Sequence, residues 1–153
     1  MSLALAVTLA AAEIEQPHLI ASVHLMPMTS FPDLLGAQVT VHAIPWVDLQ
    51  GGISGLTDRF GWYVRGGIRY LFNDWRDETH VGLTWRFSLL AGYRAMRDPK
   101  ANAAGFSGLL ATDFAYFFKE HLAFTVQLAF GGLWDNPFQR VLPELRLGFG
   151  VSF

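Results

Sequence analysis

The last ten residues of the chain, Glu144–Phe153 (ELRLGFGVSF), alternate without interruption between large apolar side chains and polar or very small ones. Successive side chains of a β-strand point to opposite faces, so in extended form this segment has one wholly apolar face. Such a strand fits a sandwich with one buried face, or a barrel wall between an apolar and an aqueous phase. The apolar face carries Leu145, Leu147, Phe149, Val151 and Phe153.

Seven earlier segments show the same two-residue period, and no helical periodicity competes with it after Ala12. Together with the terminal segment they predict eight antiparallel strands, close to the length of about 9–11 residues that crosses a bilayer at a tilt. The predicted strands are Leu19–Leu25, Ala37–Ala43, Val47–Gly55, Trp62–Phe72, His80–Arg94, Ser107–Tyr116, Leu122–Gly131 and Glu144–Phe153.

The connections between these strands alternate in length. An even number of strands lets the first pair with the last, with both termini on one side of the membrane. With both termini in the periplasm, the periplasmic turns are Ile44–Trp46, Asn73–Glu78 and Lys119–His121, and they are mostly short. The external connections are then mostly longer, and they are Pro27–Asp33, Thr57–Gly61, Arg97–Ala104 and Asp135–Leu142.

The composition is unusual for a water-soluble domain of 153 residues, with 52% hydrophobic, 14% aromatic and 16% charged residues, against about 25% charged on average. No run of about eighteen apolar residues follows the N-terminus, which excludes helical membrane spans. The net charge of −2 argues against nucleic-acid binding. The absence of cysteine excludes a disulfide framework and a thiolate metal site.

The first twelve residues (MSLALAVTLAAA) read as the apolar core and cleavage site of a secretory signal peptide that lacks its usual basic start. A retained N-terminal helix is the alternative. The expected organisation is a signal peptide at 1–12 and one β-barrel domain at 13–153.

The charges and the bulky side chains lie on opposite faces of the predicted strands. In a water-soluble barrel the apolar face points inward, and periodicity alone does not decide between the two arrangements. An eight-stranded interior is only just wide enough for side chains, so a small-residue face with a few ionic pairs fits the lumen better. Aromatic residues also gather at strand ends, as in the girdles at bilayer interfaces: Trp46, Trp62, Tyr116, Phe118, Trp134 and Phe138. We therefore expect a transmembrane barrel rather than a soluble sandwich.

Five arginines and three carboxylates fall on the lumenal face. Charges removed from bulk water must be paired, so we expect a lumenal ionic network centred on Arg65, Arg86, Glu144 and Arg146. A filled, structural lumen is one reading of this network, and a narrow anion-leaning pore gated by exchange between arginine and carboxylate is the other. Its members are Asp48, Arg65, Arg69, Arg86, Arg94, Asp113, Glu144 and Arg146.

In strand count, loop asymmetry and terminal Phe153, the chain resembles the small eight-stranded bacterial outer-membrane barrels of the OmpA transmembrane-domain and OmpX type. It departs from the OmpA pattern in its short external loops and shows no peptidoglycan-binding domain. The resemblance implies an outer-membrane location, a monomer, and a structural or surface-interaction role. It also implies contact with lipopolysaccharide and with the barrel assembly machinery, which would read Phe149, Val151 and Phe153 as an assembly signal.

An enzyme that modifies lipid A is a further alternative, because His24 precedes Ser30 and Asp33 near the expected external rim. However, no serine follows a histidine by two residues, as in the His-x-Ser pattern of the lipid A deacylase barrels. The five histidines are spread over different strands and a turn, whereas a metal needs converging ligands. We predict no catalytic residue, no metal and no cofactor.

Three glycine pairs lie inside predicted strands: Gly51-Gly52, Gly66-Gly67 and Gly131-Gly132. Glycine weakens a flat sheet, but it permits the bends and close approaches that a narrow barrel needs. A phosphate-binding loop would need a strand-to-helix transition after the glycines, and the sequence predicts none.

Overall fold

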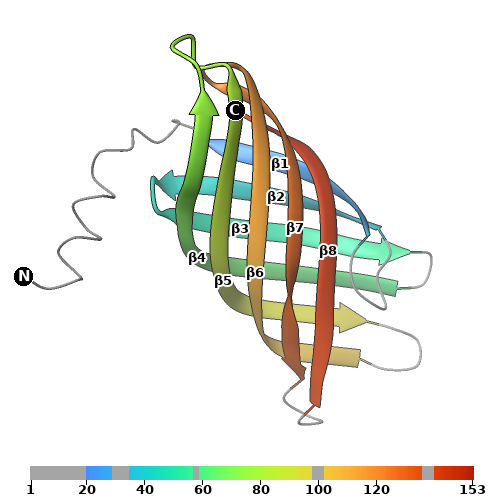
Figure 1. Ribbon diagram of the computed structural model, residues 1–153. Helices are drawn as coiled ribbons and strands as arrows, with labels where there is room; N and C mark the ends of the chain where they lie inside the picture. Colours follow the sequence, from blue (N-terminus) through green and yellow to red (C-terminus); the bar gives the residue numbers. More distant parts are fainter. Residues whose placement is uncertain (1–19, 29–34, 57–58, 98–101, 136–139) are drawn as a thin grey trace, which may run out of the picture.

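The computed structural model describes residues 20–28, 35–56, 59–97, 102–135 and 140–153, and in them the chain forms one closed barrel (Figure 1). Each strand pairs antiparallel with its sequence neighbours, which confirms the predicted all-β, eight-stranded antiparallel barrel. The strands are β1 (Ala21–Met28), β2 (Leu35–Ile44), β3 (Val47–Leu56), β4 (Arg59–Arg76), β5 (Gly82–Arg97), β6 (Asn102–Lys119), β7 (Leu122–Asp135) and β8 (Arg140–Ser152).

The barrel closes between its first and last strands, as the sequence predicts. Val23 pairs with Val151 and Leu25 with Phe149. Beyond β8, the backbone N–H of Phe153 donates to the carbonyl oxygen of Ala21 at 2.9 Å. The start of β1 and the end of β8 therefore lie together at one end of the barrel, called the terminal end below, and the other end is called the loop end.

The strands β4, β5 and β6 are much longer than β1 and bend strongly. One part of each runs in the direction of β1–β3, and the other part runs in the direction of β7 and β8 (Figure 1). Two inward glycines permit neighbouring backbones to approach closely. A Cβ atom on Gly67 would lie 2.0 Å from the carbonyl oxygen of Leu89, and one on Gly92 would lie 2.1 Å from that of Val64. No side chain fits at these separations, so glycine is required at both positions.

The segment Asn73–Glu78 is not the turn that the sequence predicts. A β-bulge between Leu71 and Asn73 shifts the register, and β4 continues to Arg76 with Trp75 on the outer wall. The bulge breaks the two-residue period, which explains why the pattern hid this part of the strand. The turn spans residues 77–81. His80 there has a φ of 62°, a left-handed conformation that a strand excludes, so β5 begins at Gly82.

The expected difference between short and long connections is weak in the structure. Residues 29–34, 57–58, 98–101 and 136–139 separate strands at the loop end, and residues 45–46, 77–81 and 120–121 do so at the terminal end. Polar segments that the sequence assigns to loops extend the strands instead, because backbone pairing continues wherever both neighbours stay extended. Loop length therefore gives no clear orientation.

The two faces of the wall differ as the alternation predicts. Large apolar side chains are exposed on the outside of all eight strands, whereas the charged residues of the strand interiors are buried in the lumen. The lumen also holds apolar side chains that the sequence interpretation did not place there, including Leu71, Leu109, Phe117 and Leu133. Leu109, Phe117 and Leu133 belong to small clusters on β5, β6 and β7, such as the one of Leu90, Leu109, Ala111 and Ala129.

Candidate functional site

One carboxylate in the lumen pairs with three arginines from three strands. Glu144 on β8 accepts hydrogen bonds from Nη2 of Arg65 on β4 at 2.7 and 3.0 Å. Its Oε1 also accepts from Nη2 of Arg146 at 3.0 Å and pairs with Nη1 of Arg94 on β5. All four side chains are almost fully buried. These residues are called the Glu144 cluster, and they link β4, β5 and β8 across the interior.

Tyr63 on β4 connects this cluster to the rest of the lumen. Its ring lies under two guanidinium groups, with ring centroid distances of 3.8 Å to Cζ of Arg146 and 4.5 Å to Cζ of Arg65. Stacking of this kind is an attractive interaction between a cation and a ring face. The Tyr63 hydroxyl donates to Oε1 of Gln38 at 2.9 Å.

A chain of side-chain hydrogen bonds continues across the barrel from Gln38. Its Nε2 donates to Oε1 of Gln127 on β7 at 2.9 Å, and Nε2 of Gln127 donates to Oδ1 of Asp113 on β6 at 2.8 Å. All hydrogen bonds in this chain are donated in one direction, from the Tyr63 hydroxyl toward the Asp113 carboxylate. The chain therefore joins the Glu144 cluster to the second group of charges through neutral side chains.

The second group of charges is centred on Asp48 of β3. Its Oδ1 lies 2.7 Å from Nδ1 of His42 and 3.3 Å from Nη1 of Arg69, and its Oδ2 accepts from the Ser88 hydroxyl at 3.2 Å. Arg69 Nη1 also contacts His42 Nδ1, and its Nη2 donates to the carbonyl oxygen of Pro45 at 3.1 Å. These residues are called the Asp48 cluster, and they close the lumen near the β2–β3 turn.

Arg86 lies with the Asp48 cluster and not with the Glu144 cluster, which corrects the predicted centre of the network. It pairs in register with Asp113 on β6, whereas the residue of β5 opposite Arg65 is Gly92. Six residues of strand separate the two positions, or about 20 Å along β5. Alternation predicts the face of a residue but not the level at which it lies, so one expected network becomes two layers.

A cavity of about 10 Å³ remains between the polar side chains near the Asp48 cluster. A cavity of that size has room for about one water molecule. Its lining includes Arg69, Arg86, Asp48, Asp113 and both lumenal histidines. Buried side chains thus occupy the lumen at both layers of charge among the described residues.

The structure describes His24, the histidine of the enzyme alternative, but not its expected partners. His24 lies in the middle of β1, almost fully buried, and its Nε2 lies 2.8 Å from the Thr125 hydroxyl. It faces the lumen, as the alternation of its strand predicts, although the enzyme alternative placed it near the external rim. Its expected partners Ser30 and Asp33 lie outside the described residues, as do the predicted signal peptide and Phe138. Within the described residues no group of three or more candidate ligands could hold a metal ion.

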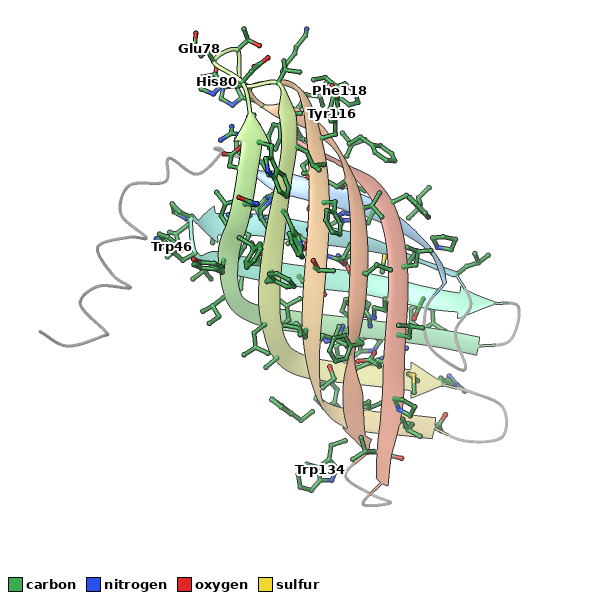
Figure 2. All side chains as sticks on the ribbon, viewed as in Figure 1. Trp46, Glu78, His80, Tyr116, Phe118 and Trp134 are labelled. Carbon is green, nitrogen blue, oxygen red and sulfur yellow. The ribbon has the colours of Figure 1, made fainter. Side chains whose placement is uncertain are left out.

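The predicted interfacial aromatics are exposed near the two ends of the barrel. Figure 2 shows Trp46, Tyr116 and Phe118 toward the terminal end, where the turn with Glu78 and His80 also lies, and Trp134 at the other end. Trp62 pairs with Ala95 near the loop end and is also exposed. The predicted assembly residues Phe149, Val151 and Phe153 all point outward.

Sequence reasoning placed eight charged residues in the lumen, assigned the buried Asp135 to a loop, and missed the neutral groups that join the charges. Tyr63, Gln38 and Gln127 carry no charge, and single polar residues on an inward face do not reveal which partners they meet. One residue in the sequence that could have indicated the position of the Tyr63 ring is the inward glycine Gly52. A Cβ atom there would lie 2.3 Å from the Tyr63 hydroxyl oxygen, so this glycine leaves room for the ring.

Among the comparisons with known proteins, one solved structure bears on the fold. No protein-family model matches the chain, and no curated protein matches it either. Among solved structures, a barrel from the de novo design of transmembrane β-barrels is similar, with a TM-score of 0.53 at 12% identity, covering 91% of this chain and 97% of that one. The attachment invasion locus protein Ail of Yersinia pestis is similar at a TM-score of 0.38 and 11% identity, covering 88% of this chain and 95% of that one.

The chain has the fold of a small transmembrane β-barrel. The architectural resemblance noted from the sequence is confirmed at this level. Among the described residues, no helix is both long and apolar enough to cross a bilayer.

Proposed function

We propose that the chain is an integral outer-membrane β-barrel with a structural or surface-interaction role, its lumen closed by the Glu144 and Asp48 clusters. The observation that supports this proposal is the exposure of large apolar side chains on the outer wall of the barrel. Ile68, Leu89 and Phe130 lie within strands of the barrel and are 58–64% exposed. A soluble monomer rarely exposes a contiguous apolar surface of more than a few hundred Å², whereas a lipid-facing barrel needs a continuous apolar band.

The charges support the same placement. Among the described residues, outward-facing charged side chains lie at strand ends or in turns, for example Arg97 and Glu78. In water there is no reason to keep charge off the middle of an exposed wall. In a bilayer there is, because the hydrocarbon region does not solvate ions.

A charge placed in the middle of the outer wall tests the proposal. Ile68 lies at the midpoint of β4 and faces outward. In a bilayer, Ile68→Arg should destabilise the barrel by about 2–4 kcal/mol, measured by urea unfolding in lipid vesicles. Glu78→Arg in the exposed turn is the matched control and should change little. An Ile68→Arg barrel that unfolds like the wild type would contradict membrane insertion, as would a soluble product whose gel migration does not change on heating.

A narrow anion-leaning pore is the second candidate, and the convergence of three arginines on Glu144 is the observation in its favour. Planar-bilayer conductance separates the two. A closed lumen predicts no conductance in the wild type, because both layers are filled. Anion-selective openings that increase in Glu144→Ala would instead support the gated pore.

The proposed partners are a bilayer containing lipopolysaccharide and the outer-membrane assembly machinery, with the chain acting as a monomer and without enzymatic activity. Deletion of Phe153 should lower the amount of barrel in the membrane more than it lowers the stability of barrel that has folded, because it removes the proposed assembly signal, whereas the folded seam loses only the backbone hydrogen bonds of Phe153 to Ile20 and Ala21. Comparing membrane abundance with urea unfolding of the purified variant measures both. Normal membrane levels would contradict a role for Phe153 in assembly.

A further inference from the structure

A hollow of about 480 Å³ lies on the barrel near the loop end, over β4, β5 and β6. This volume falls within the range of about 300–1,000 Å³ that is usual for ligand pockets. Phe60 and Trp62 form one wall, Ala95 and Ala104 lie between the strands, and Arg97 and Asn102 lie at the end nearest the rim. It is called the rim hollow here.

Strand register explains why the wall is hollow at this place. Ala95 pairs with Trp62 on one side and Ala104 on the other, so two small outward residues lie beside a large ring. One row nearer the middle of the barrel, Tyr93 pairs with Phe106 and both point outward. The alanines thus leave a depression between an aromatic row and the polar row at the rim.

The polar row consists of Arg97 and Asn102, which pair with each other across β5 and β6. Both are exposed, and among the described residues Arg97 forms no ion pair. A guanidinium group offers several N–H donors in a planar fork that fits the oxygens of a phosphate. The hollow therefore combines an apolar slot with a cation at the level where the aromatic girdle meets water.

We infer that the rim hollow binds a phosphorylated lipid of the surrounding leaflet, with its phosphate at Arg97 and Asn102 and its apolar part over Ala95 and Ala104 against Trp62. The combination of slot and cation selects an anionic amphiphile over a zwitterionic one, because the quaternary ammonium of a choline headgroup offsets the phosphate charge that attracts Arg97. This inference rests on the proposed membrane location.

Native mass spectrometry of the barrel, released from mixed micelles of phosphatidylglycerol and phosphatidylcholine, tests the inference. The wild type should retain phosphatidylglycerol in preference to phosphatidylcholine. Arg97→Gln should reduce that preference about tenfold, as expected for the loss of one charge-assisted hydrogen-bonded contact. Lys119→Gln, which removes an exposed cation at the terminal end, is the matched control and should retain it.

A second pair of variants tests the slot itself. Ala104→Leu fills the hollow and should abolish retention of both lipids, whereas Ala91→Leu, at an exposed outward position on β5 away from the hollow, should leave retention unchanged. Equal retention by Ala104→Leu and the wild type would overturn the inference, and so would an equal loss in Lys119→Gln and Arg97→Gln. A dimer that disappears in Ala104→Leu would assign the hollow to a second copy instead. Heat-dependent gel migration of each variant reports insertion separately, so these failures leave the membrane proposal standing.

Discussion

The neighbouring residues Gly66 and Gly67 lie on opposite faces of β4 and show how differently the two faces are built. A Cβ atom on Gly67 would lie 2.0 Å from the Leu89 carbonyl oxygen, whereas on Gly66 the nearest atom would be Cδ2 of Leu49 at 3.4 Å. The inner face has no volume to spare, and the outer face accepts a larger side chain in ordinary contact. On the inner face, the available space and the interaction partners determine which side chain fits at each position. On the outer face, the main requirement is that the side chain is apolar.

The largest test of this difference removes the carboxylate that three inner arginines share. Glu144→Ala leaves buried guanidinium groups without that partner, and breaking a buried ion pair in this way costs about 3–5 kcal/mol. Urea unfolding in lipid vesicles measures the loss. The outward neighbour Leu145→Ala should cost about 1 kcal/mol, because only apolar contact area is lost. Similar losses in the two variants would show that the inner face is as tolerant as the outer.

The glycine pair gives the next largest effect and compares the two faces directly. Gly67→Ala forces the backbones of β4 and β5 apart, and overpacking of this kind costs about 1–3 kcal/mol. Gly66→Ala should stay close to the wild type in the free energy of unfolding, since its added methyl group meets a side chain at an ordinary distance. If both variants unfold alike, the close approach of β4 and β5 does not depend on the inner glycine.

A smaller effect is expected where an inner group loses one hydrogen bond and keeps its shape. Tyr63→Phe retains the ring under Arg65 and Arg146 but leaves Oε1 of Gln38 without its donor, at a cost of about 1–2 kcal/mol. Tyr93→Phe makes the same chemical change on the outer face and should be nearly neutral. A neutral Tyr63→Phe would mean that the hydrogen-bond chain adds little to the stability of the inner face.

The smallest effect belongs to a turn that lies on neither face. Hydrogen bonds from the Thr79 hydroxyl and from the backbone N–H groups of Val81 and Thr79 lower the pKa of Asp77 below its ordinary value. A lowered folded-state pKa stabilises the fold above the ordinary pKa, and this contribution is lost as the pH falls through the lowered value. Asp77→Ala should therefore differ from the wild type near neutral pH and converge with it in acid. A difference that persists in acid would assign the effect to packing.

The alternation of side chains was enough to predict the barrel, its closure between β1 and β8, and the lumenal face of eight charged residues, but not of Asp135, which was assigned to a loop and is buried at the end of β7. It failed where the two-residue period breaks, at the bulge after Leu71 and at His80. Local backbone geometry there changes the face to which a side chain points without any change in the residue types. It also could not predict that Arg86 and Arg65 lie in separate layers. The level of a residue depends on the register between strands, which no single strand encodes.

The position of Glu144 in the last strand has a consequence for the order of folding. Its partner Arg65 lies 79 residues earlier in the chain, so the pair forms between segments far apart in sequence, and such contacts form late. Until β8 arrives, the guanidinium groups of β4 and β5 lack this carboxylate and are better kept hydrated. Pairing of β1 with β8 and neutralisation of the buried arginines are therefore one cooperative event. Until β8 pairs, the hydration of these arginines favours a sheet whose inner face stays open to water.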